Sequence, residues 1–230
     1  NGKPVVAVWG MCFRDRAYTL DECEALLDFL KEDPDYGGFT VMLGVPSYWR
    51  TLGADCVVDS RVYDIIKKAD IISPWSVGRF GSIHESELDS YAGNVWRKDI
   101  EWCRARKIEY MPVVFPGFSW HNLQGWGWDH IPRRGGTFLW RQFRKAVNEA
   151  QASMIYVAMF DEVDEGTAIF KCTGDPPAGS TPFLPVGNEF YPPKYPPDTQ
   201  LPSDHYLWLV GELAGKIHEG TPIPETMPSR

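Results

Sequence analysis

Residues 153–167 read Ser-Met-Ile-Tyr-Val-Ala-Met-Phe-Asp-Glu-Val-Asp-Glu-Gly-Thr. The first seven form an apolar run of strand length, and four carboxylates follow within five residues: Asp161, Glu162, Asp164 and Glu165. Continuous apolar runs are typical of strands buried on both faces of a parallel sheet. Like charges this close repel, and partial burial raises the pKa of some of these carboxyl groups. One carboxyl can then serve as a general acid while its neighbour serves as a base.

An acidic turn of this kind need not be catalytic. It can be a solvated loop, or it can bind Ca²⁺ through carboxylates such as those of Asp161, Asp164 and Glu165. The segments upstream of the turn favour a catalytic role over these two alternatives.

Four further apolar segments precede this strand, at residues 4–9, 39–45, 69–75 and 110–115. Helical patterns separate them, at residues 20–32, 60–68, 83–107 and 135–150, and a last helix is expected at 203–218. Thr19 and Glu22 form a capping box for the first helix, whereas Ser60 and Ser203 are the expected caps of two others. Five alternations of strand and helix predict a parallel α/β sheet.

Polar and aromatic clusters follow each predicted strand. Ligands bind at the carboxyl ends of the strands both in open α/β sheets and in (β/α)8 barrels. Five units cannot close an eight-stranded barrel. The sheet is therefore either open, or about three βα units of the same domain are absent from this sequence.

The composition of the chain excludes several classes of function. The chain has 230 residues, a net charge of −8 and no basic stripe, so a nucleic-acid partner is not expected. No apolar run approaches the ~20 residues that a membrane span needs, and no signal peptide opens the chain. None of the five cysteines forms a CxxC pair, and no dinucleotide or serine-hydrolase motif occurs, so we expect neither a cofactor nor a metal. An aromatic content of 14% suits recognition of sugar faces.

Residues 160–167 resemble a motif of the glycoside hydrolase family 71/99-like proteins. Family 99, the endo-α-mannosidase group, ends its last barrel strand with Phe-Asn-Glu-Trp-His-Glu-Gly-Thr. Glu162, Glu165, Gly166 and Thr167 match it, whereas Asp, Val and Asp replace the Asn, Trp and His. Residues 116–122 and 131–140 are similar to a loop and helix of relatives labelled xylosidase/arabinosidase.

The resemblance implies a (β/α)8 TIM-barrel fold, of which this chain would supply about the C-terminal five units. It also implies a catalytic domain over residues 1–219 that lacks its N-terminal units, followed by an extension at 220–230. The substrate would be an oligosaccharide or polysaccharide, and the protein would be secreted or periplasmic. Glu162 would deprotonate the sugar 2-hydroxyl, which attacks C1 to give a 1,2-anhydro sugar, and Glu165 would protonate the leaving oxygen. The general use of two carboxylates by glycosidases agrees with such a pair.

Other side chains near the predicted strand ends are candidates for substrate binding, with packing as the alternative for each. We favour a core position for Trp9 and weigh Trp75 evenly between the two roles. The arginines could instead neutralise the acidic cluster or lie on the surface. The candidates are Trp9, Trp49, Trp75, Trp120, His121, Arg133, Arg134 and Asp161. A glycan-binding protein with a degenerate site is the alternative function.

Overall fold

The structure is a computed structural model that describes residues 2–126, 130–172 and 201–230. The sequence also predicts a proline-rich loop at residues 173–202, and most of that segment lies outside the described residues. The chain forms two compact units. The first unit comprises residues 1–76, 93–113 and 152–156, and the second comprises residues 77–92, 114–151 and 157–230. Each unit is described by itself below.

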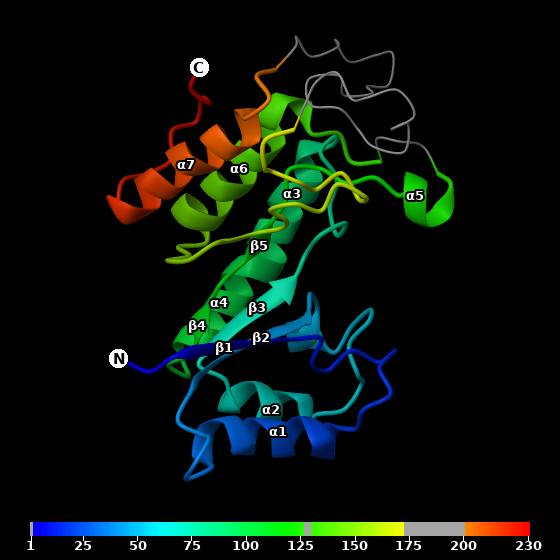
Figure 1. The fold of residues 1–230 in the computed structure, drawn as a ribbon, viewed down its shortest axis with the longest axis vertical. Helices are drawn as coiled ribbons and strands as arrows, with labels where there is room; N and C mark the ends of the chain where they lie inside the picture. Colours follow the sequence, from blue (N-terminus) through cyan, green and yellow to red (C-terminus); the bar gives the residue numbers. More distant parts are fainter. Residues whose placement is uncertain (1, 127–129, 173–200) are drawn as a thin grey trace. The chain divides into compact units, whose positions relative to one another are not determined.

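The first unit contains a parallel sheet of four strands in the order β1-β2-β3-β4 (Figure 1). The strands are β1 Val5–Trp9, β2 Thr40–Pro46, β3 Ile71–Trp75 and β4 Glu109–Tyr110. The predicted parallel α/β sheet is thus confirmed. The fourth predicted strand is divided, because Pro112 has no amide hydrogen with which to continue the ladder beyond Tyr110. The chain resumes as β5 Val113–Val114, which pairs with β6 Tyr156–Val157.

Two helices lie side by side along this sheet in Figure 1, α1 Leu20–Glu32 and α2 Val62–Lys68. The predicted capping box of α1 is confirmed, since the Glu22 amide donates to Thr19 Oγ1 at 3.2 Å and the Thr19 amide donates to Glu22 Oε2 at 2.7 Å. Ser60 was the wrong cap for α2, because Arg61 takes that position without a side-chain bond. Leu43 of β2 and Leu27 of α1 are fully buried, so the core lies between the sheet and these helices.

The predicted helix at 83–107 forms three consecutive segments. It begins as α3 Glu85–Tyr91, continues through a π-helical turn at Ala92–Trp96 and ends as α4 Arg97–Arg104. Gly93, a residue type that weakens a helix interior, lies within the π-helical turn.

The second unit contains α5 His121–Gln124, α6 Thr137–Arg144 with a π-helical turn Lys145–Glu149, and α7 His205–His218. Helices α6 and α7 lie side by side in Figure 1. Gly136 permits their approach, because a Cβ there would lie 2.5 Å from Leu209 Cδ2. Asp204, and not the expected Ser203, takes the N-cap position of α7.

Residues 220–230 pack on α6. Ile223 is buried, and its amide donates to Asn148 Oδ1 at 3.0 Å, while the Trp140 indole donates to the Pro224 carbonyl at 2.8 Å. Within the described residues the sheets are not closed into a barrel. No helix in this part of the chain is long and apolar enough to cross a membrane.

Candidate active site

The acidic turn at residues 161–167 belongs to the second unit and is closed by its own backbone. The Thr167 amide donates to the Glu162 carbonyl at 3.1 Å, and the Gly166 amide donates to the Val163 carbonyl at 3.2 Å. Gly166 has φ +67°, a left-handed conformation that glycine adopts without a Cβ clash. Thr167 is buried and also directs its hydroxyl to the Glu162 carbonyl at 3.3 Å. The Glu-Gly-Thr sequence therefore closes a turn that holds Glu162 and Glu165 close together.

The electrostatics of the turn favour the protonated form of Glu165. Its side chain is half-buried, and burial raises the pKa of the Glu165 carboxyl. The charge of Glu162 raises this pKa further, and the charge of Asp164 adds to the effect. A carboxyl with a raised pKa keeps its proton to higher pH, which is what a general acid requires.

The short helix α5 is tied to this turn. The Ser119 amide donates to the Glu165 carbonyl at 2.7 Å. The Asn122 side-chain amide donates to the Asp164 carbonyl at 3.1 Å and to Asp164 Oδ1 at 3.2 Å. Glu165 and its neighbour Asp164 are therefore held by the segment 119–122. Asn122 was not among the predicted site residues, although it lies in the Trp-His-Asn run that follows the fourth predicted strand.

Aromatic rings continue from this segment. Trp120 packs edge-on against Phe118 with ring centroids 4.7 Å apart, and Trp126 lies 6.0 Å from Trp120. His121 Nδ1 lies 2.7 Å from the Trp126 carbonyl. Trp120 and His121, both predicted site residues, thus share a segment with the residues that bond to the acidic turn. Trp126 is 54% exposed and is a further candidate that its place in the same loop could have indicated.

The two arginines have other partners. Arg133 is buried, donates to the Ala168 carbonyl and stacks 3.8 Å from the Tyr206 ring centroid. Its predicted role in substrate contact is therefore wrong, as is a surface position, because its guanidinium is enclosed by protein. Arg134 is partly exposed and donates to the Ser82 carbonyl at 2.7 Å. Asp161 is exposed at the start of the turn.

Three predicted aromatic residues lie in the first unit. Trp49 is fully buried and packs edge-on against Trp102 at 4.8 Å, so the predicted substrate contact is wrong and this residue has a packing role. Trp9 is 53% exposed, so the favoured core position is wrong. Trp9 and Trp75 are the last residues of β1 and β3, and their rings lie 5.6 Å apart at 83°.

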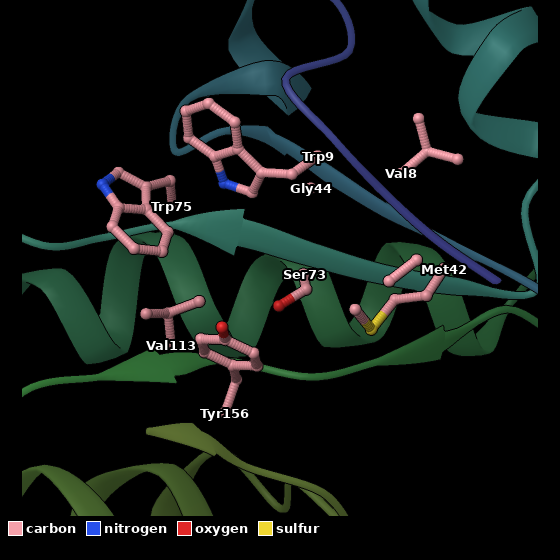
Figure 2. A pocket seen from close by; sticks show the side chains of 9 residues that line it. Val8, Trp9, Met42, Gly44, Ser73, Trp75, Val113 and Tyr156 are labelled. Carbon is pink, nitrogen blue, oxygen red and sulfur yellow. The ribbon is translucent and has the colours of Figure 1, made fainter. Parts of the chain in front are cut away.

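Trp9 and Trp75 line a cavity of about 110 Å³ within the first unit (Figure 2). The other lining residues, which together with the two tryptophans come from five strands, are Ala7, Val8, Met42, Gly44, Ser73, Val113 and Tyr156. Sequence reasoning missed Gly44, Ser73 and Tyr156. The signal for Gly44 was a glycine inside an apolar strand, which marks a close approach to the backbone.

A Ca²⁺ site at Asp161, Asp164 and Glu165 finds no support in the geometry. Across residues 2–126, 130–172 and 201–230, no group of three His, Cys, Asp or Glu side chains is arranged to hold a metal ion.

No family model matches the chain, and no curated protein matches it in sequence. Two solved structures of a GH99 endo-α-mannosidase from Bacteroides thetaiotaomicron are similar to it. The structure in complex with BIS-TRIS propane is 16% identical with a TM-score of 0.62, over 95% of this chain and 59% of that chain. The other is 16% identical with a TM-score of 0.53, over 93% of this chain and 66% of that chain. The chain therefore has a GH99-like α/β fold and spans less than two thirds of the length of these structures.

Proposed function

We propose that this chain carries the acid and base of a glycoside hydrolase that acts on an oligosaccharide or polysaccharide. One observation carries the proposal: Glu165 is half-buried, and its pKa is raised by burial and by a second glutamate of the same closed turn. The fold shared with GH99 endo-α-mannosidases supports the proposal from an independent direction.

In the proposed mechanism, each proton that Glu162 or Glu165 gains or loses in the first step is returned in the second. Glu162 takes the proton of the sugar 2-hydroxyl, and O2 attacks C1 while the bond from C1 to the leaving oxygen breaks. The leaving oxygen takes the Glu165 proton, and a 1,2-anhydro sugar remains. Glu165 then takes a proton from water, the water oxygen attacks C1, and O2 recovers its proton from Glu162. Two inversions at C1 give overall retention of configuration, one of the mechanistic exceptions among glycosidases.

Finer features of the proposal follow the family resemblance. We infer that the parallel sheet is part of a (β/α)8 barrel, with this chain supplying about five C-terminal units, and that the family 71-like and xylosidase/arabinosidase relatives share its site. Val163 and Asp164 stand where family 99 has ring-bearing residues, so the preferred sugar is proposed to differ from mannose. A secreted or periplasmic location is proposed as the place where such glycans are met.

The experiment is turnover of a glycan panel by Glu162→Gln and Glu165→Gln, with Glu212→Gln as the matched control. Glu212 is exposed on α7, so the same change of charge there leaves turnover intact. Each site variant is expected to lose activity by about 10²-fold or more while its circular dichroism is preserved, since general acid–base catalysis contributes roughly 10²–10⁴-fold. Wild-type activity in both site variants would end the proposal.

The alternative is a glycan-binding protein with a degenerate site. The replacement of two ring-bearing residues of the family motif by Val163 and Asp164 favours it. In that case the wild-type chain binds glycans without turnover, and the two glutamine variants change only the affinity.

A further inference from the structure

We propose that the cavity of the first unit binds the apolar face of a neutral pyranose ring, and that Gly44 is the residue that makes this site. Strand register aligns Trp9 with Gly44 and Gly44 with Ser73, so one row of residues crosses three strands, and Trp9 and Trp75 stand at the carboxyl ends of β1 and β3. All three residues line the cavity. The carboxyl ends of parallel strands are where α/β folds place their ligands.

Gly44 lets the Trp9 indole lie across β2. A Cβ on residue 44 would lie 2.3 Å from Trp9 Cδ1 and 3.1 Å from Trp9 Cα, so any larger residue displaces the ring. Phe13 packs 5.3 Å from the indole, and the Arg16 guanidinium lies 5.7 Å from it. Trp9 is thus held in place although it is 53% exposed, which is an arrangement suited to contact with a ligand.

The lining matches the two kinds of surface on a sugar. Indoles and the apolar side chains of Ala7, Met42 and Val113 suit the C–H face of a pyranose. The hydroxyl groups of Ser73 and Tyr156 point into the same space in Figure 2 and suit the sugar hydroxyls. At about 110 Å³ the cavity is somewhat smaller than the ~150 Å³ engineered cavity that binds benzene, so one ring enters it in part.

The charge of the lining selects the class of sugar. Among the described residues that line the cavity, none is charged. Arg16 lies beside the Trp9 indole but is not part of the lining, so a uronic acid or a sugar phosphate would find no cation within the cavity to pair with its anion, and burying an unpaired charge is costly. The ligand is therefore a neutral sugar within an oligosaccharide.

The test is calorimetric binding of neutral trisaccharides, namely mannotriose, xylotriose and cellotriose, with trigalacturonic acid as the charged comparison. The full chain carrying Glu165→Gln is used, so that no substrate is consumed. Gly44→Val and Trp75→Ala are each expected to weaken binding at least tenfold, whereas Leu26→Ala, an exposed apolar position on α1, leaves it unchanged. The melting temperature of every variant is measured, so that a variant that has lost the site is distinguished from one that has lost the fold. Gly44→Ala is included as a smaller change at the same position.

Three results would each overturn the proposal. The first is unchanged affinity in folded Gly44→Ala and Trp75→Ala, the second is that no neutral trisaccharide binds, and the third is a preference for trigalacturonic acid. Its failure is distinct from failure of the hydrolase proposal. Trisaccharide binding that depends on Trp75, with no turnover by the wild-type chain, rejects hydrolysis alone. Turnover that depends on Glu165 but not on Gly44 or Trp75 rejects this site alone.

Discussion

The carboxyl of Glu165 shows how single residues set the chemistry of the turn. The charge of Asp164 raises the Glu165 pKa, so Asp164→Asn lowers it. A general acid works in its protonated form, and the alkaline limb of the kcat/KM profile is therefore expected to move to lower pH. The Asp161→Asn variant is the control, because Asp161 is not among the groups that raise this pKa. A limb that stays in place, or that moves to higher pH, contradicts the assignment of Glu165 as the acid.

The same residue has a consequence for stability. The folded-state pKa of Glu165 is raised above its usual value of 4.5, so ionisation of Glu165 opposes folding. Its favourable contribution is present below the unfolded pKa and is lost as pH rises through the folded pKa. Glu165→Gln is therefore expected to melt at a higher temperature than the wild type at pH 8. Calorimetry should show this gain shrinking towards pH 4, and a lower melting temperature at pH 8 would contradict a raised Glu165 pKa.

At the scale of elements, the attachment of α5 to the acidic turn depends on Asn122. Asn122→Ala removes both side-chain hydrogen bonds to Asp164, each worth about 0.5–1.5 kcal/mol net. Steady-state kinetics are expected to show kcat falling about tenfold with little change in melting temperature, because Asn122 is exposed. Gln124→Ala, an exposed position on the same helix, is the matched control. Equal kinetics in the two variants would show that α5 does not position the turn.

A buried ion pair joins three elements of the first unit. Arg50 Nε, in the 3-10 turn Trp49–Thr51, donates to Asp99 Oδ1 of α4 at 2.6 Å, and the Tyr110 hydroxyl of β4 donates to Asp99 Oδ2 at 3.3 Å. Asp99 is 1% exposed, and burial raises its pKa to about 7 even though Arg50 and Tyr110 each lower it. Because Arg50 lowers this pKa, its removal raises the Asp99 pKa further, and the buried carboxyl must then either ionise without a partner or take up a proton.

Arg50→Ala is expected to lower the free energy of unfolding by about 3–5 kcal/mol at pH 8, the usual cost of breaking a buried pair. The loss should be smaller at pH 5, where Asp99 takes up a proton. Lys67→Ala breaks only the exposed pair with Asp64 and should cost about 0–1 kcal/mol. Urea denaturation at pH 8 and pH 5 measures the free energy of unfolding of the wild type and of both variants. An equal loss at both pH values would show that Asp99 does not titrate in this range.

At the scale of the whole molecule, binding of Ca²⁺ by the acidic turn is a second alternative to catalysis, beside glycan binding by a degenerate site. Addition of a chelator to the native protein is expected to change neither its melting temperature nor its turnover. A ligand that binds only the folded state raises the free energy of unfolding by an amount that grows with the logarithm of one plus the ratio of free ligand concentration to Kd, so a structural Ca²⁺ would be revealed by a fall in melting temperature on chelation. A fall in melting temperature that added Ca²⁺ reverses would favour a Ca²⁺ site over the hydrolase proposal.

The order of the elements along the chain was predictable because its signals are local. Apolar runs of strand length indicated β1, β2 and β3, and alternation with helical periodicity indicated that they are parallel. The capping box of Thr19 and Glu22 depends on residues three positions apart, so it too could be predicted. The single catalytic domain over residues 1–219 stays a prediction, and the structure adds that each compact unit is assembled from segments distant in sequence.

The sequence by itself determined the parallel α/β character of the chain and the concentration of carboxylates after its last strand, since both follow from neighbouring residues. The tertiary structure decided which side chains reach solvent. Trp49 and Arg133 are buried, whereas Trp9 is half exposed. The amino-acid types alone do not predict which of these side chains is buried. Exposure depends on strand register and on packing between distant segments. The approach of Trp9 to Gly44 and of Asn122 to Asp164 arises only when those segments meet.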